Sequence, residues 1–115
     1  MNLKTLFAAA QAQILWADPA HETADILHVV AADLMSDVLM MDLDRPLLLT
    51  SLATDQALRT AHIVGAVAVL VANGKKIPAE MAALARKLGL PLARTALPTF
   101  DAAVALGKAI GSQMS

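Results

Sequence analysis

Cysteine is absent from this sequence of 115 residues. Without thiols, the chain can form no disulfide, no thiolate metal site and no cysteine nucleophile. A composition without cysteine fits a reducing compartment, so we expect a cytoplasmic location. Aromatic residues make up only 3% of the chain, and tyrosine is absent. The core must therefore be built from aliphatic side chains.

Charge of either sign is also scarce, with 17% charged residues and a formal net charge of −1. Proteins that bind nucleic acid neutralise phosphates with an excess of lysine and arginine, which is missing here, so we expect no nucleic-acid partner. No stretch of the chain approaches the ~20 continuous apolar residues that cross a bilayer, so we expect no membrane span.

The sequence lacks the motifs of known cofactor sites and catalytic centres. The segment Asn73-Gly74-Lys75-Lys76 is the nearest approach to a phosphate-binding loop, but it lacks the first glycine and the final hydroxyl of that motif. Dinucleotide-binding, protein-kinase and nucleophile-elbow patterns are absent, and the three histidines do not have zinc-site spacing. We therefore expect no cofactor, no metal and no catalytic residue, and a non-enzymatic protein is favoured over an enzyme.

Hydrophobic residues, by contrast, make up 57% of the chain, against roughly 45–50% in an average domain. A surface so poor in charge is expected to carry apolar area that a partner covers, which predicts a homodimer. The length predicts one domain spanning residues 1–115, and it is sufficient to bury a core without disulfides or metal.

Apolar strands alternate with amphipathic helices along the chain. We expect strands at 14–16, 26–32, 47–49, 66–72 and 91–95, and helices at 3–10, 33–41, 54–64, 78–88 and from 99 onward. Such alternation is typical of βαβ units. It predicts an α/β domain with a mostly parallel sheet of about five strands and helices on both faces. The last helix is expected to bury Phe100, Ala103, Val104, Gly107 and Ile110.

Polar residues follow each of the predicted inner strands. Because the carboxyl ends of parallel strands meet at one edge of a sheet, these residues are expected to gather there and to hold a small polar or anionic ligand. The candidate ligand-binding residues are Asp33, Ser36, Asp37, Thr50, Ser51, Asn73, Gly74 and Thr95. Ordinary turn and cap chemistry is the alternative explanation, since it uses the same residue types.

Asp33 and Asp37 lie four residues apart at the start of a predicted helix, which would place both carboxylates on one face. They could bind Mg²⁺ through water or act as an acid–base pair. Alternatively, Asp33 caps the helix and Asp37 interacts with its dipole. If the two carboxylates bind a metal or act as an acid–base pair, the alternative function follows: a small enzyme or phosphotransfer subunit that uses Asp33 and Asp37 with Thr50 or Ser51.

Several segments of the chain resemble the DRTGG domain, most specifically residues 33–38, 67–84 and 88–95. The pentapeptide that gives the domain its name is absent, and the resemblance is to the small stand-alone members sometimes labelled serine kinases. It implies an α/β fold and a dimeric regulatory module that binds a small molecule or nucleotide. In other proteins the domain is joined to phosphotransacetylases, or to pyrophosphatases with cystathionine-synthase-type domains. Stand-alone relatives accompany redox enzymes such as iron-only hydrogenases, so a redox enzyme is the implied partner, and no catalytic residue can be carried over.

Overall fold

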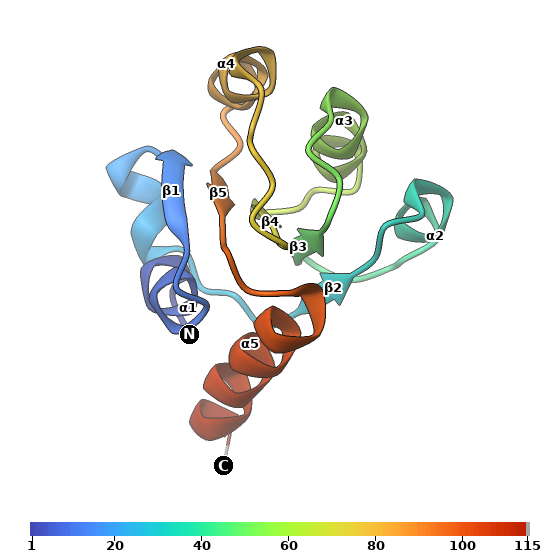
Figure 1. Cartoon of the computed structure of the whole chain (residues 1–115). Coiled ribbons are helices and arrows are strands. Elements are labelled where there is room, and N and C mark those ends of the chain that lie inside the picture. The colour runs from blue at the N-terminus through green and yellow to red at the C-terminus, as the bar shows by residue number, and fades with distance from the viewer. Residues whose placement is uncertain (115) are drawn as a thin grey trace.

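A five-stranded sheet separates two layers of helices in the computed structural model, which describes the backbone of residues 1–114 and the side chains of residues 1–111 (Figure 1). The elements follow the predicted alternation of strands and helices. In chain order they are α1 (Leu3–Ala9), β1 (Gln13–Trp16), a 3-10 helix η1 (Pro19–Thr23), β2 (Val29–Ala31), α2 (Met35–Leu39), β3 (Leu47–Thr50), α3 (Asp55–Ile63), β4 (Ala68–Val71), α4 (Ala79–Leu88), β5 (Leu92–Arg94) and α5 (Thr99–Met114).

The strands lie in the order β1-β5-β4-β3-β2. Strands β2 to β5 run parallel to one another, and β1 pairs antiparallel with β5 at the edge. The predicted α/β class, with a mostly parallel sheet of five strands, is therefore confirmed. Strand β2 is shorter than the predicted 26–32, because the backbone N–H of Ile26 donates to the carbonyl of Met1 instead of joining the sheet.

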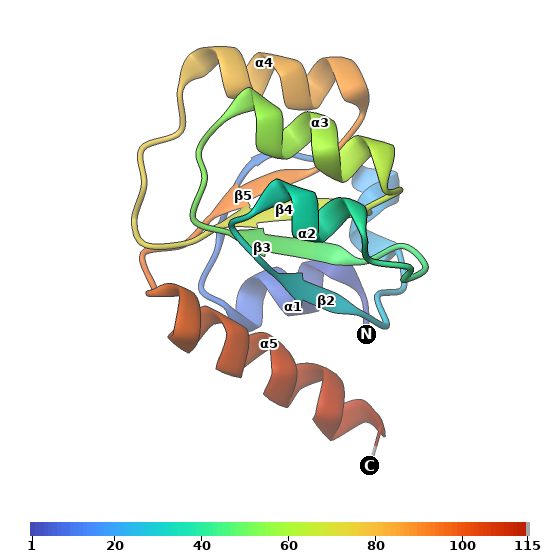
Figure 2. The ribbon, with the colours of Figure 1, turned by 90° about the vertical axis from the view of Figure 1, so that its right-hand side faces the viewer.

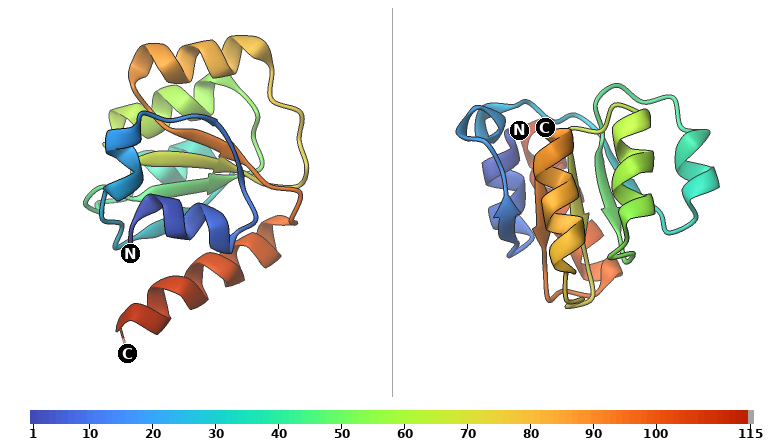
Figure 3. Two further views of the ribbon diagram at one scale, coloured as in Figure 1. Left: turned by 90° about the vertical axis from the view of Figure 1, so that its left-hand side faces the viewer. Right: turned by 90° about the horizontal axis from the view of Figure 1, so that it is seen from above.

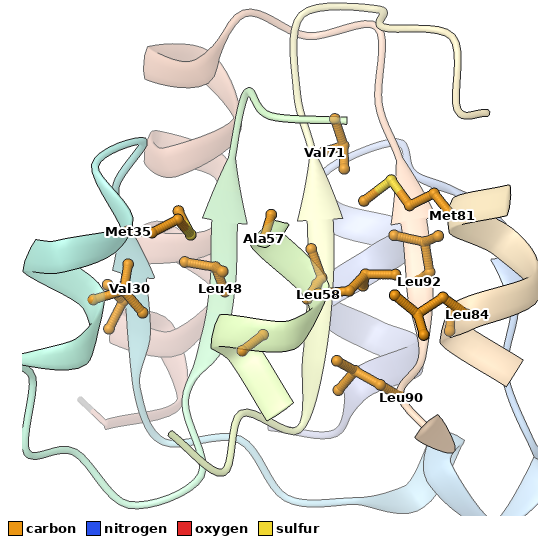
Figure 4. Close-up of a cluster of buried hydrophobic side chains, with 14 residues drawn as sticks. Val30, Met35, Leu48, Ala57, Leu58, Val71, Met81, Leu84, Leu90 and Leu92 are labelled. Atoms are coloured by element: carbon orange, nitrogen blue, oxygen red, sulfur yellow. The ribbon is translucent and has the colours of Figure 1, made fainter. Parts of the chain in front are cut away.

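Helices α2, α3 and α4 cover one face of the sheet, and α1 and α5 cover the other (Figure 2). Alternate strand residues point to opposite faces. Leu48 and Val69 pack in the cluster beneath α2, α3 and α4, which Figure 4 shows, while Leu49 and Leu70 pack in the cluster with α1 and α5. Strands β3 and β4 are buried on both faces, which accounts for their unbroken apolar sequences.

The orientation of α5 differs from the prediction. Among the residues of α5 up to 111, Ala102 and Leu106 are fully buried, whereas Phe100 is 68% and Val104 39% exposed, and Gly107 is exposed as well. The prediction was wrong about Phe100, Val104 and Gly107, because α5 has only two charged residues, Asp101 and Lys108, in its 16 positions. A helix that is apolar nearly all round gives little signal about which side faces the core.

No helix in residues 1–114 combines the length and apolar character that crossing a membrane requires.

Candidate functional site

The polar residues after the inner strands lie along one edge of the sheet. The register pairs Ala31 with Leu49, Thr50 with Val71, and Val71 with Arg94, so the four parallel strands end at nearly the same level. The arrowheads of β3 and β4 point the same way in Figure 4. The residues that follow these positions therefore share the carboxyl edge, where open α/β sheets bind ligands.

Asp33 links the end of β2 to the end of β3. Its Oδ1 accepts hydrogen bonds from the backbone N–H of Ser51 at 2.7 Å and from Oγ1 of Thr50 at 3.0 Å. Its Oδ2 accepts a third bond from Oγ of Ser51 at 2.6 Å. Bonds to a carboxylate are stronger than bonds between neutral groups. The structure thus brings three predicted site residues, Asp33, Thr50 and Ser51, into direct contact.

Asp33 does not cap a helix, so that alternative reading of the residue is wrong. Helix α2 begins at Met35, and its N-cap is Leu34, which makes no side-chain cap bond. Instead, the carboxylate of Asp33 accepts hydrogen bonds from Thr50 and Ser51 at the end of β3. Because Asp33 lies outside the helix, the spacing of four does not place it on a helical face with Asp37. Ser36 and Asp37 are exposed in the first turn of the short helix α2.

The hydrogen bonds to Asp33 also change its acidity. The backbone N–H of Ser51, and next the Ser51 hydroxyl, lower the pKa of the Asp33 carboxyl below its usual range. Partial burial raises this pKa, and the Thr50 hydroxyl and the nearby charge of Lys75 lower it further. Asp33 is therefore an anion at neutral pH and a weak proton acceptor.

Replacing Asp33 with Asn weakens the bonds from Thr50 and Ser51, and it is expected to destabilise the chain by about 1 kcal/mol at pH 7. The loss stays this small because the side chain is partly exposed and solvent screens its bonds. The pKa of the Asp33 carboxyl is lower in the folded state than its ordinary value of 3.8. The carboxylate therefore stabilises the fold above about pH 3.8, and this contribution is lost as the pH falls through the folded-state pKa. Urea unfolding of both proteins between pH 7 and pH 2.5 should show the difference shrinking in acid.

Asp37→Asn is the matched control at pH 7, since Asp37 is exposed on α2 and bridges no strands. A change below about 0.5 kcal/mol is expected for this surface substitution. A difference between wild type and Asp33→Asn that stays constant down to pH 2.5 would contradict the proposed electrostatic role.

The side chains of Asn73 and Thr95 bond to the helix layer formed by α1 and α5. The Asn73 side chain accepts a bond from the backbone N–H of Thr99 at 3.0 Å and donates to Oγ1 of Thr99 at 3.1 Å, which holds the first turn of α5. The buried Thr95 hydroxyl donates to the carbonyl of Ala10 at 2.7 Å and accepts from the backbone N–H of Leu97 at 3.2 Å. The structure thus gives both side chains bonds within the fold, and ligand contact by the eight predicted residues stays a prediction.

Asn73 and Gly74 form the predicted turn after β4. Both adopt left-handed backbone conformations, with φ of +69° and +65°, which asparagine and glycine tolerate best. Their backbone N–H groups donate to the carbonyls of Leu97 and Thr95. This turn leads into a loop with the exposed residues Lys75 and Lys76.

Arg94, at the end of β5, is a further candidate site residue that was not among those predicted from the sequence. Its guanidinium donates to the carbonyl of Lys75 at 2.9 Å, to that of Gly74 at 3.1 Å and to Oε1 of Gln13 at 3.3 Å. Arg94 thereby ties the loop after β4 to strand β1. The sequence does carry one indication of its role, since Arg94 is the single charged residue in the otherwise apolar segment 90–94. A charged side chain in a largely buried strand needs specific hydrogen-bond partners.

Two hollows lie at opposite ends of the sheet. One of about 230 Å³, at the carboxyl edge, is lined by Gln13, Lys76 and Arg94 with apolar neighbours. The other, of about 310 Å³, is lined by residues that include His21, Arg45 and His62, and it lies at the amino ends of the strands. No group of three potential metal-ligating side chains is found among the described residues.

These features define a small α/β domain with polar and basic residues gathered at the carboxyl edge of its sheet. No protein-family model matches the sequence, and the curated proteins include no match. Among solved structures, the chain is similar to the CBS and DRTGG domains of the regulatory region of Clostridium perfringens pyrophosphatase, complexed with its activator diadenosine tetraphosphate. The TM-score is 0.72 at 14% sequence identity, over 91% of this chain and 45% of that chain. At this identity the likeness shows the fold alone, and the chain spans less than half of its structural neighbour.

Proposed function

We propose that this chain is a non-catalytic regulatory module, a single DRTGG-like domain over residues 1–115 that forms a homodimer. It binds a small anionic ligand at the carboxyl edge of the sheet. Two findings support this proposal: the resemblance of the sequence to stand-alone DRTGG domains, and the similarity of the fold to a regulatory region that binds a nucleotide activator. The redox-enzyme partner and the cytoplasmic location rest on the sequence, and they belong to the same proposal.

The observation that carries the ligand proposal is the hollow of about 230 Å³ at the end of β5. Its lining includes the cationic side chains of Lys76 and Arg94 and the amide of Gln13, groups that donate hydrogen bonds to phosphate or carboxylate oxygens. The bonds from Arg94 to Gly74 and Lys75 hold the guanidinium and the loop in place before any ligand arrives. Such preorganisation reduces the entropy lost on binding.

The geometry of Asp33 favours this function over the alternative phosphotransfer enzyme. A general base needs a pKa near the working pH, but the bonds from Ser51 lower the pKa of Asp33. Both carboxylate oxygens also accept bonds from Thr50 or Ser51. Three of the four residues that the enzyme hypothesis assigns to catalysis, Asp33, Thr50 and Ser51, are therefore bonded to one another between the ends of β2 and β3.

A thermal-shift titration with inorganic phosphate, ATP and diadenosine tetraphosphate tests the ligand proposal. At 100 times its Kd, a ligand specific for the folded state contributes about 2.7 kcal/mol, which raises Tm by roughly 10 °C in a domain of this size. The Lys76→Ala variant should need at least about tenfold more ligand for the same shift. Lys87→Ala, on the exposed side of α4, is the matched control and should respond as wild type does.

An unchanged Tm with all three anions, or an equal response of Lys76→Ala and wild type, would contradict the ligand site. Incubation with labelled ATP separates the two functions. Specific turnover that is lost in Asp33→Asn, with the fold retained, would favour the enzyme instead.

A further inference from the structure

Helix α5 has two apolar sides, and only one of them packs on the sheet. Ala102 and Leu106 are buried in the cluster with α1, β3 and β4, whereas Phe100 and Val104 face away from it and are exposed. Figure 2 shows α5 below the sheet, with one side turned away from the rest of the chain. Apolar side chains on both sides of a helix are typical of buried helices. The outward side of α5 is therefore expected to be covered in the working protein.

A hollow of about 550 Å³ lies along this outward side. Its apolar lining comes from the end of α1 through Ala9, from the loop before α5 through Leu97, and from α5 itself through Phe100, Val104 and Ala105. Figure 3 shows α1 beside α5. The charged residues in the lining are Asp101 and Lys108, which are also the two charged residues of α5.

We propose that this surface binds a second copy of the chain, with the two α5 helices antiparallel about a twofold axis that passes between Val104 and Ala105. The inference rests on the homodimer of the proposed function, and it names the surface through which the dimer forms. In such an arrangement each copy offers the same patch to the other, so the patch must be complementary to itself.

The charges of α5 meet this requirement. Asp101 and Lys108 are seven residues apart, so they lie two turns apart on the same face, about 10 Å along the helix axis. The midpoint between them falls between Val104 and Ala105. An antiparallel pair centred there sets Asp101 of each copy opposite Lys108 of the other. A parallel pair would instead set like charges opposite each other, which is unfavourable.

The apolar residues fit the same arrangement. Val104 and Ala105 are small, and at the axis they allow the two helices to approach closely. Phe100 lies one turn before Val104, level with the aliphatic stem of Lys108 from the other copy. Large aromatic side chains near the centre of an interface commonly carry much of the binding energy. The apolar residues thus supply the affinity of the dimer, and the two charge pairs fix the antiparallel orientation of the two α5 helices.

Sedimentation equilibrium at 1 to 200 µM, with charge-reversal variants, tests the proposal. Asp101→Lys and Lys108→Asp each place like charges opposite one another, and each should raise the dimer Kd by at least about tenfold. The double variant Asp101→Lys/Lys108→Asp restores opposite charges, and its Kd should return to within about threefold of wild type. Lys87→Asp, on the exposed side of α4, is the control that changes charge without touching the surface.

The outcomes separate the two proposals. A wild-type chain that stays monomeric up to 200 µM overturns both the homodimer and this surface. A wild-type dimer whose Kd is unchanged in both single variants overturns the surface and leaves the homodimer. Single variants that weaken the dimer without rescue by the double variant overturn the antiparallel pairing.

A cross-linking experiment locates the axis. The chain has no cysteine, so Ala105→Cys introduces a single thiol beside the proposed axis. Mild oxidation should convert this variant to a disulfide-linked dimer, because the two thiols lie within reach of each other. Ala83→Cys on the exposed side of α4 is the matched control, and it should stay monomeric on a denaturing gel. Cross-linking of Ala83→Cys in preference to Ala105→Cys would overturn the arrangement.

Discussion

Replacing Leu106 with Ala is expected to lower the free energy of unfolding by about 2–5 kcal/mol, while replacing Phe100 with Ala on the same helix is expected to cost less than about 1 kcal/mol. Leu106 is completely buried in the cluster that includes Phe7 and Leu49, so its truncation leaves a cavity. Phe100 is mostly exposed and loses few contacts within its own chain. Urea unfolding at a protein concentration below the dimer Kd measures both effects.

Protein concentration is the internal control for this pair of variants. Above the dimer Kd, association stabilises the folded chain, and Phe100→Ala should then lose more stability than it does in dilute solution. Leu106→Ala should show nearly the same loss at both concentrations. A loss of several kcal/mol for Phe100→Ala in dilute solution would contradict the orientation of α5.

Replacing Thr95 with Val is expected to destabilise the chain by about 2–3 kcal/mol, although valine has nearly the same shape. The substitution removes the hydroxyl that donates to the carbonyl of Ala10 and accepts from the backbone N–H of Leu97. Thr95 and Ala10 are buried, so the Ala10 carbonyl loses its partner where water does not easily replace it. Chemical denaturation with the same probe for both proteins measures the difference.

Thr95→Ser is the matched variant, because serine keeps the hydroxyl and loses only a methyl group. It should cost about 1 kcal/mol or less, so valine should be the worse substitution despite its better match in volume. Equal stability of Thr95→Val and wild type would mean that the hydroxyl does not hold α1 to the sheet. Thr95 would then again be open to the ligand contact predicted from the sequence.

The architecture could be predicted from the sequence because its signals are local. The unbroken apolar sequences of β3 and β4 indicated strands covered on both faces, and the helices between them required parallel connections. Those two inferences place the carboxyl ends of the inner strands on one edge. The left-handed turn at Asn73 and Gly74 and the helix end at Gly89 are likewise local, since they depend on residues that tolerate positive φ.

The partners of the site residues could not be predicted, because they are distant in sequence. Asp33 bonds to groups 17 and 18 residues further on, yet an aspartate before an amphipathic segment is also the usual sign of a helix cap. Thr95 bonds to a carbonyl 85 residues away. The antiparallel direction of β1 was not predicted either, because its four residues carry no signal of orientation.

The turn after β4 is bonded both to Arg94, which lines the hollow at the end of β5, and to the start of α5. On one side, the carbonyls of Gly74 and Lys75 accept hydrogen bonds from the guanidinium of Arg94, next to the hollow proposed to bind an anion. On the other side, the amide of Asn73 holds Thr99 at the start of α5. If an anion binds in that hollow and two copies meet through α5, as proposed, this turn connects the two binding events. Any effect of the anion on dimerisation would then be matched by an equal effect of dimerisation on the affinity for the anion.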